Sequence, residues 1–153
     1  MMHLSQPCPT KLWIAVLSLA FGFFLGCERG PQIAQLRGKV LYKDGSVPQG
    51  GVRVVRFEPV ANAPAEQRQT ATGAIQLDGT FEMCRRVPGD GVLHGDYAVT
   101  FTVWKGPREP VSFVDDKFTN SATTPYHLTV EGDRDDLFFE IERAALGQQQ
   151  TSR

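Results

Sequence analysis

The chain has 153 residues, of which 41% are hydrophobic and 22% charged, and its formal net charge is −1. This composition is that of a globular protein, and the balance of charge provides no basic stripe for nucleic acid. The cysteines and histidines do not occur at the spacings of a zinc site, so the sequence predicts no metal site and no cofactor.

The N-terminal segment has the succession of features found in a secretory signal peptide. A single charge, Lys11, precedes an apolar run from Leu12 to Leu25, and Gly26 and Cys27 follow. Fourteen residues form a helix of about 21 Å, which is too short for a hydrocarbon core of about 30 Å. A charge, a short apolar run and a small residue are typical of a cleaved signal peptide. We therefore predict that residues 1–26 are removed.

The cysteine after this junction makes the prediction more specific. Phe24-Leu25-Gly26-Cys27 resembles the bacterial lipobox, which implies cleavage by signal peptidase II before Cys27 and lipidation of Cys27. Each buried methylene contributes about 0.8 kcal/mol, so two or three acyl chains anchor a protein essentially permanently. The expected location is the cell envelope, membrane-anchored and facing the periplasm or the exterior. An ordinary signal peptide and an uncleaved anchor are the alternatives.

Cleavage would leave 127 residues with 15 Lys and Arg against 17 Asp and Glu, enough for one domain with one core. Cys84 would be the only cysteine free of lipid, so no intramolecular disulfide is expected. A lone cysteine is more often a small packing residue than a reactive thiol or an intermolecular bridge. Residues 27–34 are predicted to be the lipidated cysteine and a tether of about 25 Å at most.

Residues 35–143 alternate apolar and polar side chains with a period of two, which is typical of half-buried strands. A bulge is expected within 52–58, and the run 111–118 adds a short strand or a helical turn. Residues 85–94, rich in glycine, are expected to form a loop, and residues 144–153 a disordered tail. The seven predicted strands cover residues 36–42, 52–58, 70–77, 80–83, 97–104, 126–130 and 137–141.

Asp78-Gly79 predicts a hairpin in which both turn residues take positive φ. The strand at 97–104 has the clearest inward face and is expected to be central. Seven short strands with one apolar face each predict an all-β fold, a two-sheet antiparallel sandwich of the transthyretin-like or immunoglobulin-like kind. The predicted core residues are Val55, Phe81, Tyr97, Phe101, Leu128 and Phe139.

Several motifs in this order resemble one family. The chain is similar to carboxypeptidase regulatory-like domains, in the form found in short planctomycete lipoproteins. The resemblance implies a transthyretin-like sandwich and brings no catalytic residues. It rests on Gly38-Lys39-Val40-Leu41-Tyr42 with Asp44-Gly45, Val55-Arg56-Phe57-Glu58-Pro59, Leu77-Asp78-Gly79-Thr80-Phe81, Gly95-Asp96-Tyr97-Ala98-Val99 and the run from Phe118 to Val130.

Few residues suggest chemistry. His94 lies near Asp90 and Asp96 in the sequence, and a His/Asp pair supports a base only where a nucleophile stands beside it. His127 has outward parity and is expected to be solvated. The acidic clusters of residues 115–116 and 133–136 are more typical of turns than of a calcium site. No catalytic residue is therefore assigned, and the serines, Ser112 and Ser121, lack a nucleophile motif.

Trp104 and Phe138 have outward parity, so one interpretation is that they form an exposed apolar patch. The preferred interpretation is that the excursion 106–124 covers the outer face beside Trp104. The sequence as a whole predicts a non-catalytic envelope lipoprotein with a structural or interaction role. Its expected contacts are the membrane, through the lipid, and an envelope protein or polysaccharide. A carbohydrate- or peptide-binding module is the first alternative, and a small hydrolase is a more distant one.

Overall fold

The computed structural model describes residues 32–65 and 68–145, and it is built from strands with a short 3-10 helix, η3 (Asp116–Phe118). The predicted signal peptide, Cys27 and most of the predicted tail lie outside the described residues. The strands are β1 (Ile33–Ala34), β2 (Leu36–Tyr42), β3 (Val52–Pro59), β4 (Ala71–Ala74), β5 (Thr80–Glu82), β6 (Val92–Leu93), β7 (Gly95–Gly106), β8 (Glu109–Ser112), β9 (His127–Val130) and β10 (Arg134–Ile141).

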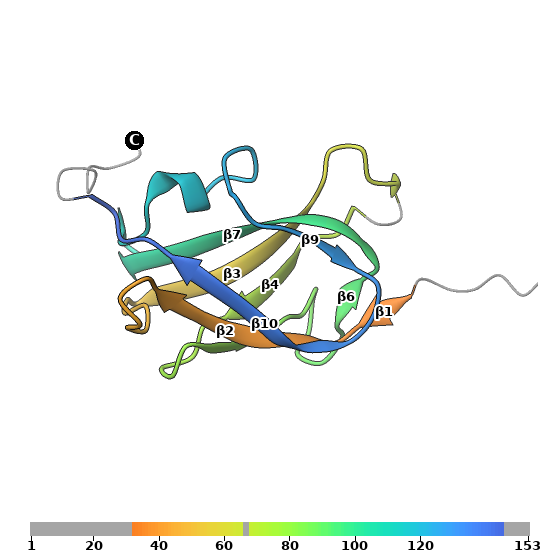
Figure 1. Ribbon diagram of the computed structural model, residues 1–153, viewed down its shortest axis with the longest axis horizontal. Helices are drawn as coiled ribbons and strands as arrows, with labels where there is room; N and C mark the ends of the chain where they lie inside the picture. Colours follow the sequence, from red (N-terminus) through yellow and green to blue (C-terminus); the bar gives the residue numbers. More distant parts are fainter. Residues whose placement is uncertain (1–31, 66–67, 146–153) are drawn as a thin grey trace, which may run out of the picture. The chain divides into compact units, whose positions relative to one another are not determined.

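Two sheets lie face to face (Figure 1). The larger has the order β4-β3-β7-β8, with β9 also paired to β7, and the smaller has the order β10-β2-β5. The pairs are antiparallel except for β10 and β2, which run parallel. The all-β sandwich predicted from the alternation is confirmed, with three short strands, β1, β6 and β8, beyond the seven expected.

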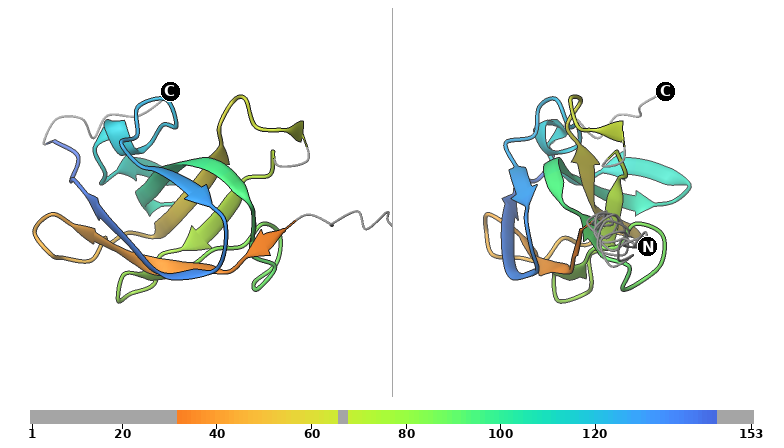
Figure 2. Two further views of the ribbon diagram at one scale, coloured as in Figure 1. Left: turned by 45° about the vertical axis from the view of Figure 1, so that its right-hand side comes forward. Right: turned by 90° about the vertical axis from the view of Figure 1, so that its right-hand side faces the viewer.

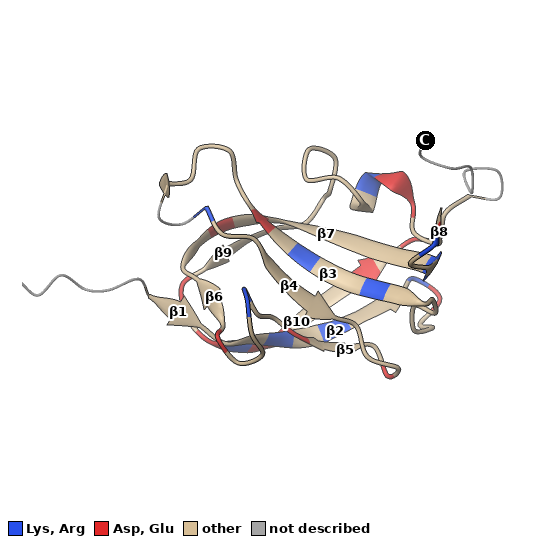
Figure 3. Ribbon diagram, turned by 180° about the vertical axis from the view of Figure 1, so that it is seen from behind, with Lys and Arg blue, Asp and Glu red and all other residues tan. Residues whose placement is uncertain are grey.

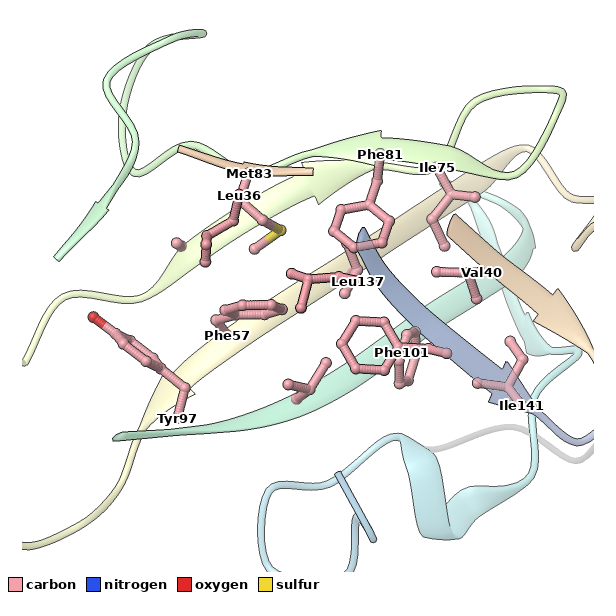
Figure 4. Packing of buried hydrophobic residues seen from close by; sticks show 14 of the residues in the cluster. Leu36, Val40, Phe57, Ile75, Phe81, Met83, Tyr97, Phe101, Leu137 and Ile141 are labelled. Carbon is pink, nitrogen blue, oxygen red and sulfur yellow. The ribbon is translucent and has the colours of Figure 1, made fainter. Parts of the chain in front are cut away.

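The core lies between the two sheets and is rich in aromatic rings (Figure 4). Phe101 of β7, 1% exposed, lies opposite Phe139 of β10, with 5.5 Å between ring centroids. Phe139 also contacts Phe57 and Phe81, at 6.4 and 6.0 Å. Offset and edge-on rings at these separations stabilise a core beyond the area that they bury. All predicted core residues are buried except Leu128, which is only partly buried.

The pairing of β2 with β10 in the small sheet depends on a glycine. Gly38 of β2 pairs with Leu137 of β10, next to an irregularity in the register of β10. A Cβ on Gly38 would lie 2.2 Å from the carbonyl oxygen of Leu137. Glycine in a strand often marks such a close approach of another backbone. Gly38 therefore allows β10 to lie beside β2 at this point.

The hairpin at Asp78-Gly79 differs from the prediction. Only Gly79 has positive φ, at 87°. The Gly79 N–H donates to Gln76 O at 3.0 Å and the Gln76 N–H donates to Thr80 O at 2.8 Å, so the loop has three residues. A type I turn followed by glycine is the usual solution for that length. This loop carries the chain from β4 in one sheet to β5 in the other.

Two other predictions are corrected by strand pairing. The expected bulge in the second strand is absent, since β3 pairs with β7 without a break from Val52 to Pro59. The predicted tether and the predicted loop 85–94 both contribute strands, because Ile33 and Ala34 of β1 pair with Leu93 and Val92 of β6. Ala34 is fully buried, so the folded part of the chain begins before residue 35.

The excursion after β7 closes one side of the sandwich. It contains both a strand, β8, and a helical turn, η3, where the sequence allowed either. Phe118 of η3 is buried and meets Phe101 edge-on at 6.4 Å. The Tyr126 hydroxyl donates to Glu140 O at 2.6 Å and accepts from the Glu140 N–H at 3.1 Å. It thereby satisfies the outer edge of β10, which would otherwise be open to pairing.

Candidate functional site

The clearest candidate surface is the outer face of the small sheet. Alternation along β10 buries Leu137, Phe139 and Ile141, so Phe138 points outward and is 54% exposed. Its backbone partner is Lys39 of β2. A shallow hollow of about 700 Å³, the Phe138 hollow, crosses this face. It is lined by Arg37, Gly38, Lys39, Gln76, Thr80, Phe81, Glu82, Asp135, Asp136, Leu137 and Phe138.

The charges around the Phe138 hollow are largely paired. Arg37 binds Glu82 at 3.0 Å across β2 and β5, and Arg134 binds Asp136 at 2.9 Å. The hydrogen bond from the Arg134 guanidinium lowers the pKa of Asp136 below its ordinary value. Positions of both signs also occur along the ribbon seen from behind (Figure 3). An exposed aromatic ring beside hydrogen-bonding side chains is a feature that often marks a contact surface.

A second hollow, of about 350 Å³, lies at the far end of β10. Glu142 is held there between two lysines, with 2.6 Å to Lys117 Nζ and 2.8 Å to Lys43 Nζ. The hydrogen bond from Lys117, and then that from Lys43, lower the pKa of Glu142 to about 2. Sequence analysis did not find this cluster, because its members are separated by 74 and 25 positions in the chain. Only the meeting of η3, β2 and the end of β10 brings them together.

The Glu142 cluster predicts a pH dependence. Because the folded-state pKa lies below the ordinary value of 4.5, the stabilisation is complete above about pH 4.5 and is lost as the pH falls toward 2. Glu142→Gln should remove the loss of stability that occurs in this pH range. A carbon-13 NMR titration of the Glu142 carboxyl measures the pKa directly. Lys117→Met should raise it more than Lys43→Met does, and a midpoint near 4.5 in the unmodified protein would contradict the assignment.

The histidines do not form a catalytic pair with the neighbouring aspartates. The Asp90 carboxylate accepts backbone N–H groups from Arg85, Arg86 and Val87, and the Asp96 carboxylate accepts from the Thr129 hydroxyl at 2.6 Å. In the described part of the chain, no hydrogen bond or ion pair joins a histidine side chain to another residue. His127 is exposed on β9, as its parity predicted.

Several of the remaining candidate side chains have structural partners. Asp115 caps η3 by accepting the Lys117 N–H, and Asp133 accepts the Gln35 N–H at 2.7 Å. The Ser112 hydroxyl donates to Val114 O at 2.9 Å. Residues 32–65 and 68–145 contain no group of three or more side chains arranged to hold a metal ion. Cys84 is half-buried, and its thiol donates to Thr72 O at 3.5 Å.

Trp104 and Phe138 do not form a single patch. Trp104 lies on β7 of the large sheet, alternates with buried Val103, and is half-buried opposite Ser112 of β8. Phe138 lies on the outer face of the other sheet. The outer faces of two packed sheets point in opposite directions, so the alternative of a joint patch is excluded. The preferred interpretation, cover by the excursion 106–124, holds in part, because Trp104 pairs with Ser112 of that excursion and is half-buried.

Cys27, the predicted lipidation site, lies outside the described residues. Within the segments that are described, no helix is long and apolar enough to cross a membrane.

Comparison with known proteins identifies no family. No family model matches the chain, and no curated protein matches it. A crystal structure of a DUF3823 family protein from Parabacteroides merdae is similar, with a TM-score of 0.43 and 13% identity over 74% of this chain and 48% of that one. The chain thus spans about half the length of that protein. The sandwich is therefore established by the strand pairing of this chain itself.

Proposed function

We propose that this protein is a non-catalytic cell-envelope lipoprotein, anchored through Cys27, whose sandwich has a structural or interaction role. The observation that carries the proposal is the apolar run Leu12–Leu25 followed by Gly26-Cys27. The position of β1 supports it. Ile33 lies six positions after Cys27, so the folded domain begins within about 21 Å of the anchor.

The finer family assignment is part of this proposal. The domain is of the carboxypeptidase regulatory-like, transthyretin-like kind. Its motif residues have structural roles that support the resemblance: Gly38 permits the approach of β10, Gly79 takes positive φ, and Tyr97 is buried with its hydroxyl donating to Leu93 O at 3.0 Å. Each of these roles belongs to the framework of the fold rather than to a reaction.

A carbohydrate- or peptide-binding role is the second candidate, and the Phe138 hollow favours it. An aromatic ring that is more than half exposed beside hydrogen-bonding side chains can stack on an apolar sugar face or hold an apolar side chain. The partner in either case is an envelope polysaccharide or protein that meets the small sheet.

Cys27→Ala is expected to move the protein from the membrane to the soluble fraction while leaving it exported. Without the thiol there is no site for the diacylglyceryl group, and the buried methylenes that hold the anchor are lost. Cell fractionation followed by immunoblotting measures the change. Cys84→Ser is the matched control and should remain with the membrane. A Cys27→Ala protein that stays in the membrane with residues 1–26 attached would show that the segment is an uncleaved anchor.

Phe138→Ala is expected to abolish capture of the envelope partner in a pull-down with the intact lipoprotein. The substitution removes the exposed ring without touching the core, so the unfolding midpoint should stay within experimental error. Leu77→Ala is the matched control, because Leu77 is 75% exposed and lies outside the Phe138 hollow. Equal capture by both variants and the unmodified protein would exclude this face as the binding surface.

A further inference from the structure

One end of the sandwich, here called the β1 end, carries β1, the loop 85–91 and the turn between β9 and β10. The pairing of β1 with β6 and the hydrogen bond from the Arg134 N–H to Gln35 O place these segments together. Figure 2 (right) looks onto this end. If the lipid is attached at Cys27, as proposed above, the chain can span about 21 Å at most between the bilayer and Ile33. The β1 end is then the part of the domain nearest the membrane.

The loop 85–91 at this end is rigid. The Asp90 carboxylate accepts the N–H groups of Arg85, Arg86 and Val87 at 2.7, 2.9 and 3.3 Å. The Arg85 guanidinium closes the loop by donating to Asp90 O at 2.9 Å and to Gly91 O at 3.2 Å. A loop that orders its own backbone in this way loses little conformational freedom when its tip binds a surface.

The loop is also held against the strand that leads to the anchor. The Gln35 side chain donates to Gly89 O at 3.0 Å. Gly91 has a φ of 64°, and a Cβ there would lie 2.6 Å from both Ala34 O and Ile33 Cγ2. The position of the loop relative to β1 is therefore set by direct contact between the two segments.

The tip of this loop exposes an aliphatic side chain to solvent. Val87 is 59% exposed, and Ile33 on the adjoining strand is 46% exposed. Arg86, next to Val87, is exposed as well. An aliphatic side chain flanked by arginine is suited to the bilayer interface. There the aliphatic group contacts acyl chains and the guanidinium group contacts lipid phosphates.

The charges of the β1 end are unequally placed. On the loop Arg85 and Arg86 outnumber Asp90, whereas across β1 from it exposed Glu131, Asp133 and Asp135 outnumber Arg134. In the end-on view the loop 85–91 and the β9–β10 turn lie on opposite sides of β1 (Figure 2, right). A surface of lipid phosphates attracts the loop 85–91 and repels the acidic β9–β10 turn. A domain on a short tether therefore turns the loop toward the bilayer.

We propose that the loop 85–91 is a membrane-contacting element that inserts Val87 into the interface of the bilayer that carries the Cys27 lipid, with Arg86 on the lipid phosphates. This orientation keeps the small sheet and the Phe138 hollow clear of the loop's contact. The proposal rests on the lipid anchor, and its test begins with a check of that anchor.

The test uses the full lipoprotein purified from its native membrane, in a Cys84→Ser background. Mass spectrometry of the N-terminal peptide first establishes whether Cys27 is acylated. Val87→Cys and, separately, Leu77→Cys are labelled with an environment-sensitive nitrobenzoxadiazole dye and reconstituted in phosphatidylethanolamine–phosphatidylglycerol vesicles. Leu77 is the matched control, because it is exposed but lies on the hairpin loop between β4 and β5, at the opposite end of the sandwich. Brominated lipids then quench any dye that enters the bilayer.

The dye at position 87 should lose most of its emission to brominated lipid, and the dye at position 77 should lose none. Arg86→Glu should restore emission at position 87. Quenching at neither position, or at both equally, would overturn the membrane contact although the protein is acylated. A dye at position 87 that is shielded from water but not quenched would overturn the membrane contact and assign the loop to a second copy of this protein instead. An N-terminal peptide without lipid would reject the anchor itself, and this inference with it.

Discussion

Replacing Phe101 by alanine is expected to lower the free energy of unfolding by about 3–5 kcal/mol. Phe101 is 1% exposed and meets three rings, those of Phe139, Tyr126 and Phe118, at 5.5, 6.0 and 6.4 Å. The partners come from β10, from η3 and from the segment just before β9, so the cavity cannot close without moving several elements. A loss of this size is a large part of the stability of a typical domain. Urea unfolding of the mature chain, followed by tryptophan fluorescence, measures it.

The control for Phe101→Ala follows from the structure. Parity alone suggested Thr100→Ala, but Thr100 is only 4% exposed and its hydroxyl donates to Glu58 Oε1 at 3.3 Å. Thr102 has the same outward parity and is half-buried, so Thr102→Ala is the better comparison. It should cost less than about 1 kcal/mol, as surface substitutions usually do. Similar losses from Phe101→Ala and Thr102→Ala would show that the inward face of β7 is assigned wrongly.

Gly38→Ala is expected to destabilise the domain by about 3 kcal/mol, the upper part of the range for overpacked sites. The added methyl would lie 2.2 Å from Leu137 O and 2.6 Å from Leu137 Cβ. Both obstacles belong to or adjoin the backbone of β10, so no side-chain rotation relieves them. The parallel pairing of β10 with β2 has to loosen, and the urea midpoint should fall accordingly.

Gly132→Ala is the matched control for Gly38→Ala. Gly132 lies in the β9–β10 turn, has no positive φ, and nothing lies within 4 Å of an added Cβ. The substitution reduces the freedom of the unfolded chain without strain in the native one, so stability should be unchanged or rise by about 0.4–1 kcal/mol. If Gly38→Ala is as mild as Gly132→Ala, β10 does not lie as close to β2 as the structure shows.

The candidate surface could be predicted only in part. The alternation of residues 137–141 placed Phe138 outside, and the structure agrees. Parity could not decide whether Phe138 shares a patch with Trp104, because it states which side of its own strand a residue occupies but not which sheet the strand joins. The cluster of Lys43, Lys117 and Glu142 had no local signal, since each residue alone resembles an ordinary solvated charge.

What the sequence by itself determined is seven of the strands and the apolar face of each. The period-two pattern of residues 97–103 requires one apolar face whatever the neighbours are, because successive side chains in a strand point to opposite sides. The N-terminal order of charge, apolar run and cysteine, a local pattern, likewise carries the prediction of a lipid anchor without any knowledge of the fold.

Only the tertiary structure decided which strands pair and where the ends of the domain lie. The parallel contact of β10 with β2 and the pairing of Ile33-Ala34 with Val92-Leu93 join segments about 60 or more residues apart. A two-residue strand has too few side chains to show a period, and pairing direction depends on long-range packing rather than on the residues of either strand alone. The same long-range packing brings the loop 85–91 against the strand that follows the proposed anchor.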